Sequence, residues 1–170
     1  MTGNISFRDM KPGEEGPVCD LARRVFDQFV SPHYTDIGIK EAYKISSPDA
    51  LIEACGQFGH VVLVAVKDEE IVGVVKIKDE NHISWLFVKP DYQKQGIARE
   101  LIRRSITLCL GNNPALSQMT VNSSPNAISA YTRYGFTALG SESETGGIRF
   151  TPMALHLPGE RRPRKEITEM

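Results

Sequence analysis

Ile83-Ser-Trp-Leu-Phe-Val-Lys-Pro-Asp-Tyr-Gln-Lys-Gln-Gly-Ile-Ala98 is the stretch that decides the fold. It predicts a strand, a short turn that carries Pro90, and a loop that enters a helix at Gly96. No serine, threonine or aspartate stands just before Gly96 to cap the helix, so its first N–H groups are left for another acceptor. Such groups bind phosphate together with the positive helix end. The segment therefore indicates a phosphorylated cofactor.

The helix after Gly96 has one apolar face, made by residues that recur at three- and four-residue steps: Ala98, Leu101, Ile102, Ser105, Ile106 and Cys109. We expect it to run through Leu110, because a glycine and a proline follow within residues 111–114. The pattern Gln-x-x-Gly-x-Ala at 93–98 is short, and alone it fits an ordinary strand-to-helix turn as well as a phosphate cradle. It has neither P-loop spacing nor the glycines of a dinucleotide fingerprint.

A second segment strengthens the phosphate reading. Residues 119–122 predict a short strand, Ser124 and Pro125 predict the start of a helix, and Gly135 predicts its end. The loop at 93–98 and Tyr131-Thr-Arg-Tyr-Gly-Phe136 together resemble the GNAT superfamily of acyl-CoA-dependent N-acyltransferases. The resemblance covers roughly residues 3–156, the first third in layout rather than in motif.

The order of predicted elements agrees with that family. We expect a strand at 5–8, helices at 14–30, within 31–47 and at 47–55, a three-strand meander at 60–67, 71–78 and 82–88, and a closing strand pair at 136–140 and 148–156. The fold class expected is mixed α/β (α+β): a mostly antiparallel sheet of about seven strands with about four helices. The resemblance implies that the fourth and fifth strands splay apart. One domain is expected at 1–157, followed by a polar, basic tail at 158–170.

Composition is that of an ordinary globular domain, with 41% hydrophobic and 24% charged residues. A net charge of −1 gives no argument for binding nucleic acid or a membrane. The one basic cluster favours a solvated tail over a docking site: Arg161, Arg162, Arg164 and Lys165. Three cysteines without a Cys-x-x-Cys pair indicate neither a disulfide framework nor a zinc site. Without a signal peptide or a long apolar run, we expect a cytoplasmic protein.

The resemblance implies acetyl-CoA (coenzyme A) as the cofactor. Its pantetheine arm would lie between the splayed strands and bond to the backbone of Leu86, Phe87 and Val88, which are otherwise simple core residues. Its pyrophosphate would meet the loop, where Gln93 replaces the family's commoner arginine and Lys94 partly compensates. The full set of expected cofactor-binding residues is Leu86, Phe87, Val88, Gln93, Lys94, Gln95, Gly96, Ile97, Ala98, Arg99, Asn122 and Asn126.

The implied reaction is aminolysis of a thioester. Tyr131 matches the family's general acid, which protonates the leaving thiolate; the alternative is a core tyrosine. His82 is the candidate general base, since imidazole titrates near neutrality. A surface histidine and an ordered water chain are the alternatives. A backbone N–H at Phe87 or Val88 is expected to hold the oxyanion.

Acceptor choice is expected in the segments 31–46 and 141–147. Candidate acceptor-binding residues there are Glu142 and Glu144, whose carboxylates would attract a cationic amine unless they are only solvated, and Tyr34 and Asp36, which would line the same mouth. The sequence favours an N-acetyltransferase for a small amine or a protein amino group. A non-catalytic acyl-CoA-binding or sensing protein is the alternative. The resemblance also allows a homodimer, because GNAT proteins often pair through late strands.

Overall fold

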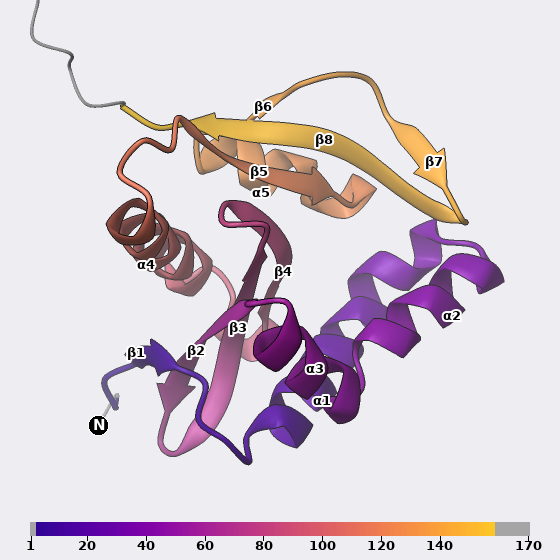
Figure 1. Cartoon of the computed structure of the whole chain (residues 1–170). Coiled ribbons are helices and arrows are strands. Elements are labelled where there is room, and N and C mark those ends of the chain that lie inside the picture. Colours follow the sequence, from indigo (N-terminus) through magenta and orange to yellow (C-terminus); the bar gives the residue numbers. More distant parts are fainter. Residues whose placement is uncertain (1–2, 159–170) are drawn as a thin grey trace, which may run out of the picture.

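A twisted sheet of eight strands forms the centre of the molecule, and the computed structural model describes residues 3–158 (Figure 1). The strand order is β1-β2-β3-β4-β5-β8-β6, with β7 paired to β8. All neighbours are antiparallel except β4 and β5. The strands are β1 (Ser6–Asp9), β2 (Val61–Lys67), β3 (Glu70–Lys78), β4 (His82–Val88), β5 (Gln118–Ser123), β6 (Thr137–Ala138), β7 (Ser143–Thr145) and β8 (Ile148–His156).

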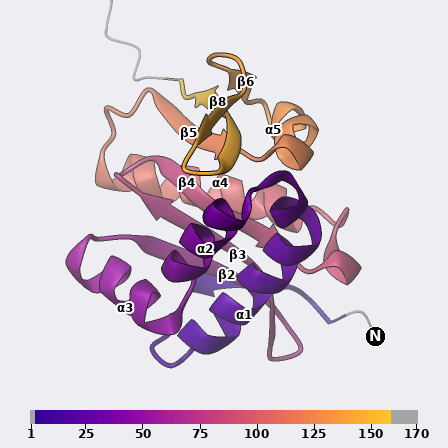
Figure 2. The same ribbon diagram turned by 90° about the vertical axis from the view of Figure 1, so that its right-hand side faces the viewer.

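Helices cover both faces of this sheet. The α-helices are α1 (Glu15–Val25), α2 (Asp36–Ile45), α3 (Pro48–Gln57), α4 (Ile97–Asn112) and α5 (Ile128–Arg133). Figure 2 shows α1, α2 and α3 in front of the sheet and α4 behind it. Two apolar cores result: α1 and α3 pack on one face around Val64 and Val74, and α4 packs on the other around Val75 and Leu101. The expected fold class is thus confirmed, with eight strands and five α-helices in residues 3–158.

The meander of β2, β3 and β4 forms as predicted. Valine and isoleucine dominate these strands, and such side chains favour the pleated backbone. A two-residue turn, Asp68 and Glu69, joins β2 to β3, and a three-residue turn, Asp79 to Asn81, joins β3 to β4. The first two residues of each turn have φ of 49–68°. Positive φ at both central residues gives the twist that a tight hairpin requires.

A β-bulge separates β4 from β5. The register of β4 on β3 shifts between Lys76 and Ile77, which leaves Ser84 without a partner between Ile83 and Trp85. A bulge bends its strand, and the pairing of β4 with β5 ends here, after His82↔Thr120 and Ile83↔Val121. The expected splay of the fourth and fifth strands is therefore present.

Several element boundaries differ from the expectation. The first helix becomes a π-helix at Phe26–Val30, followed by a 3₁₀ turn at Ser31–His33. Helix α4 continues past Gly111 to Asn112. Ser124 makes no side-chain cap; it precedes a 3₁₀ turn at Pro125–Ala127. Ser47 does cap α3, by accepting from the Ala50 N–H at 3.2 Å.

Strand β7 was expected to be loop, and the expected strand at 136–140 shrinks to Thr137–Ala138. Cys19 and Cys109 are buried. No helix within residues 3–158 is both long and apolar enough to cross a membrane. The expected basic tail lies outside the described residues, apart from its first residue.

Candidate active site

A cavity of about 970 Å³ opens through the gap between β4 and β5. Its walls come from both halves of the sheet and from the helices on either side. The residues that line it on the side of α4 and α5 include Gln93, Lys94, Gly96, Ile97, Ala98, Arg99, Asn122, Asn126, Tyr131 and Tyr134. On the side of α1 and α2 they include Arg23, Phe26, Phe29, Tyr34, Glu41 and Ile45. The lining therefore includes residues of both the predicted phosphate loop and the predicted acceptor segment.

The β4 edge of this cavity offers free backbone groups. The Lys89 N–H donates to Val72 O at 2.9 Å, so Lys89 faces β3. Backbone groups of a paired strand alternate in direction, so the Phe87 N–H also faces β3, whereas those of Leu86 and Val88 face the gap. Of the two expected oxyanion donors, this geometry favours Val88 over Phe87.

The loop at 93–98 is shaped by two left-handed residues, Lys94 at φ 62° and Gly96 at φ 84°. Among residues 3–158, no side chain caps α4, whose first turn begins after Gly96. The Gln93 side-chain amide donates to Val88 O at 3.0 Å and so ties the loop to the end of β4. The amides of the first turn are therefore held beside the cavity without a partner from a capping side chain, as a phosphate site requires.

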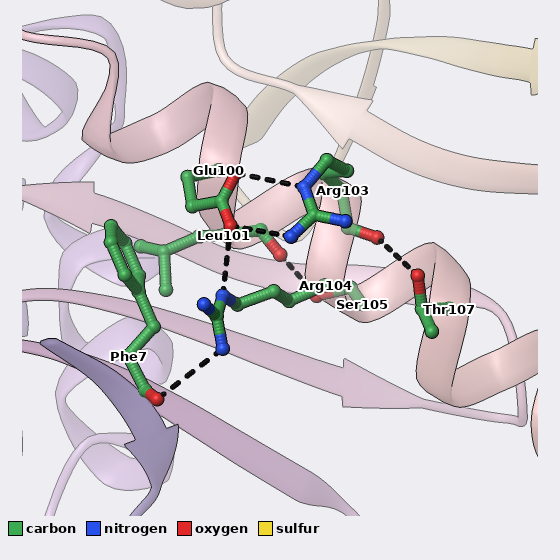
Figure 3. A network of polar contacts seen from close by, with 7 residues as sticks. All are labelled: Phe7, Glu100, Leu101, Arg103, Arg104, Ser105 and Thr107. Carbon is green, nitrogen blue, oxygen red and sulfur yellow. Dashed lines mark hydrogen bonds and ion pairs between the residues drawn. The ribbon is translucent and has the colours of Figure 1, made fainter.

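Arg99 is the arginine of α4 that turns toward the cavity. Glu100 binds both Arg103 and Arg104 on the outer face of the helix, at 2.7 and 2.9 Å (Figure 3). Arg104 also donates to Phe7 O of β1. The Arg99 guanidinium instead lies 5.3 Å from the centre of the Tyr134 ring, which also lines the cavity. With Lys94 and Arg133, it places three of the four cations of the described lining near the loop, and Arg23 lies on the side of α1 and α2.

Tyr131 lines the cavity from α5 and is only 7% exposed. Its ring meets Phe136 and Tyr134 edge to face, with centroids 5.3 and 6.3 Å away. Burial, with Tyr134 adding to it, raises the pKa of the Tyr131 phenol. The hydroxyl is consequently protonated at neutral pH and is held in one place by the packing of its ring.

Comparison with known proteins identifies the family to which this chain belongs. The family described as acetyltransferase (GNAT) domain matches residues 30–157. The chain belongs to the GNAT family. This GNAT domain is 28% identical to the uncharacterized N-acetyltransferase YafP of Escherichia coli (strain K12), over 87% of this chain and 92% of that protein. Family membership makes the chain an acyltransferase enzyme.

Solved structures share the fold of this GNAT domain. A GCN5-related N-acetyltransferase structure from Rhodopseudomonas palustris superimposes with a TM-score of 0.74 at 22% identity, covering 92% of this chain and 98% of that one. The PaiA N-acetyltransferase of Thermoplasma acidophilum, in complex with coenzyme A, gives 0.73 at 15% identity, covering 91% and 99%.

Most of the expected cofactor residues of the GNAT domain do line the cavity: Leu86, Phe87, Val88, Gln93, Lys94, Gly96, Ile97, Ala98, Arg99, Asn122 and Asn126. Gln95 does not, because its side chain turns back to donate to Asp91 O at 3.3 Å.

His82, the candidate general base, lies outside the lining of the cavity. It stands where β4 and β5 still pair, and its Nδ1 lies 2.7 Å from Thr120 Oγ1. Burial lowers the pKa of His82. A base has to reach the proton it removes, so the position of His82 at the closed end of the gap argues against the predicted role.

The acceptor residues are divided. Tyr34 lines the cavity, whereas Asp36, Glu142 and Glu144 do not. Glu142 pairs with Arg149 at 3.0 Å, and Asp36 is exposed in the first turn of α2. The predicted attraction of a cationic amine by these carboxylates is thus not supported by their positions.

The sequence did not predict the aromatic lining that Phe26 and Phe29 of the π-helix provide. It also did not predict two charged lining residues, Arg23 and Glu41. The run from residue 14 to 30 reads as one continuous amphipathic helix, and nothing in it marks the π-turn. Such turns occur often at functional sites.

Proposed function

We propose that the chain transfers the acetyl group of acetyl-CoA directly to a primary amine while both are bound. One observation carries this proposal: a single cavity connects the uncapped start of α4 to Tyr131 and to the α1–α2 side. The coenzyme A bound to the related Thermoplasma enzyme supports the choice of cofactor.

In the proposed complex, the pyrophosphate accepts hydrogen bonds from the first amides of α4, beside Lys94 and Arg99. These cations favour the phosphate charge. The pantetheine arm runs along the gap and pairs with the outward backbone groups of Leu86 and Val88, as an added strand would. The thioester then lies between β4 and Tyr131.

The chemistry follows from this placement. The neutral amine nitrogen attacks the thioester carbonyl, an N–C bond forms, and the carbonyl oxygen becomes an oxyanion that an N–H of β4 facing the gap stabilises. The C–S bond then breaks, and the thiolate takes the proton of the Tyr131 hydroxyl. The proton lost by the amine passes to water, and water restores the tyrosine proton. Water takes the role expected of His82, because no histidine lines the cavity within residues 3–158.

Thermal unfolding with acetyl-CoA, coenzyme A or ATP tests the proposal. Ligand at 100 times its Kd adds about 2.7 kcal/mol to the free energy of unfolding, which raises Tm by roughly 5–10 °C for a chain of this size. We expect that rise with acetyl-CoA and coenzyme A but not with ATP, and thiol release when an amine is added. No shift with any of them would overturn the proposal. A shift without turnover would favour the alternative of a non-catalytic acyl-CoA-binding protein.

A further inference from the structure

The two ends of the cavity differ in chemistry. The loop end carries Lys94, Arg99 and Arg133, which suit phosphate. The other end, between α1, α2 and β4, is lined mainly by large apolar and aromatic side chains: Phe26, Phe29, Tyr34, Ile45, Trp85 and Phe87. An acceptor bound there contacts rings rather than charges.

Packing fixes these rings before any acceptor binds. Phe26 meets Tyr34 edge to face at a centroid distance of 5.5 Å, and it is 8% exposed. Trp85 is 6% exposed and lies 6.3 Å from the Phe87 ring. The π-helix adds Phe29 and Val30 to the same wall. A preformed apolar surface of this kind binds flat or branched apolar groups with little loss of side-chain entropy.

The charged residues at this end do not provide the carboxylate partners that a second ammonium group would need. Only Arg23 and Glu41 are charged among the described residues that line it. Arg23 donates to the carbonyls of Ser46 and Tyr43 at 3.1 and 2.9 Å, at the end of α2. Glu41 is exposed and pairs with Lys44 at 2.7 Å. A polyamine needs several carboxylates, because each buried ammonium without a partner is costly.

We infer that the acceptor is a primary amine carried on an aromatic or branched apolar body, and not a polyamine. This inference rests on the proposed function and names the substrate class of the same site. The body packs against the wall formed by Phe26, Phe29 and Trp85, and the single amine points along β4 toward Tyr131.

A panel of amines at fixed acetyl-CoA tests the inference by thiol release: 2-phenylethylamine, isoamylamine, ethanolamine and spermidine. We expect kcat/KM for 2-phenylethylamine and isoamylamine to exceed that for spermidine at least tenfold, since a few apolar contacts give that discrimination. Equal or better turnover of spermidine or ethanolamine would overturn it.

A matched pair of variants locates the effect. Phe29→Ala removes a ring from the wall and should lower kcat/KM for 2-phenylethylamine about tenfold or more, with little change for ethanolamine. Phe58→Ala removes an equal ring that is 67% exposed at the end of α3 and should change neither. Equal effects of the two variants would contradict the assignment of the wall.

The cofactor measurement separates the two proposals. If coenzyme A raises Tm but the apolar amines are not preferred, or no amine of the panel reacts, the inference on the acceptor fails and cofactor binding stands. If coenzyme A gives no shift, the proposed function itself fails.

Discussion

Tyr131 brings together a ring fixed by two aromatic neighbours and a phenol whose pKa is raised by burial. A raised pKa keeps the proton on the oxygen up to at least the ordinary value of about 10. Deprotonation of Tyr131 should therefore not lower the activity anywhere between pH 6 and pH 10.

Tyr131→Phe should lower kcat by about 10²–10⁴, because it deletes the proposed proton donor while keeping the ring. The Kd of coenzyme A, measured by calorimetry, should change little. Tyr43→Phe serves as the control, since it removes a hydroxyl that donates to Asp27 outside the cavity lining. Full activity in Tyr131→Phe would remove Tyr131 as the acid.

Lys76 is a buried cation, 3% exposed, whose Nζ lies 3.8 Å from the centre of the Trp85 ring. It makes no ion pair among the described residues. Burial lowers the pKa of Lys76 to about 8, from 10.5. The unfolded chain then binds more protons between these two values, so stability rises as pH increases from 8 to 10.5.

Lys76→Met should therefore unfold at higher denaturant than the parent chain at pH 7. The lowered pKa corresponds to a free-energy cost of about 3 kcal/mol for burying the charged ammonium. The contact with Trp85 offsets up to about 2 kcal/mol of this cost. The net gain expected in urea melts is about 1–2 kcal/mol, and it should shrink by pH 10. A variant that is less stable at both pH values would contradict this account.

The conformation of the loop that leads into α4 depends on Gly96. At Gly96 the φ of 84° strains any other residue, although an added Cβ would meet no atom within 4 Å. Gly96→Ala should cost about 1–2 kcal/mol of stability and should weaken coenzyme A binding at least tenfold in calorimetry, because the loop amides turn away from the phosphate.

Gly111 provides the matched control within the same helix. It lies in the last turn of α4 with open space around it. Gly111→Ala should stabilise the protein by about 0.5–1 kcal/mol and leave the Kd of coenzyme A unchanged. If both variants weaken binding equally, the loop geometry is not the cause.

Local patterns of the sequence predicted much of this element-level structure. The meander followed from β-branched runs with polar turns, and the phosphate loop from a glycine and a missing cap. The π-helix could not be predicted, because Phe26 and Phe29 continue the apolar face of α1. Strand β7 has an exposed polar sequence, and only the adjacent Gly146-Gly147 pair, typical of a tight hairpin, pointed to it. The position of His82 depends on its register against Thr120, which no local pattern reports.

At the scale of the whole molecule, the turn between β7 and β8 docks on the start of α2. The Thr35 N–H donates to Gly147 O at 3.0 Å. A Cβ on Gly147 would lie 1.9 Å from Thr35 Oγ1, and one on Gly38 would lie 2.4 Å from Gly147 O. This contact, which we call the glycine clasp, joins the late strands to the helices on the acceptor side (Figures 1 and 2).

Gly147→Ala should break the glycine clasp and shift the acceptor wall. We expect kcat/KM for the amine to fall roughly tenfold to a hundredfold, as misplacement of a bound substrate does. The Kd of coenzyme A should stay within about twofold, because the loop end of the cavity lies elsewhere. Gly140→Ala is the control, since a Cβ there meets nothing within 4 Å. Unchanged amine kinetics in Gly147→Ala would show that the clasp does not shape the acceptor site.

Two residue pairs are the whole of the ladder that joins β4 to β5. We expect the group of β5, β6 and β8 to open in hydrogen exchange at a lower free energy than the meander, because few backbone hydrogen bonds join the two groups. A coenzyme that pairs with β4 across the gap adds a missing rung and couples the two groups. We expect protease resistance of the segment after β5 to follow coenzyme occupancy, so that the lifetime of the protein in a cell would report the supply of its own substrate.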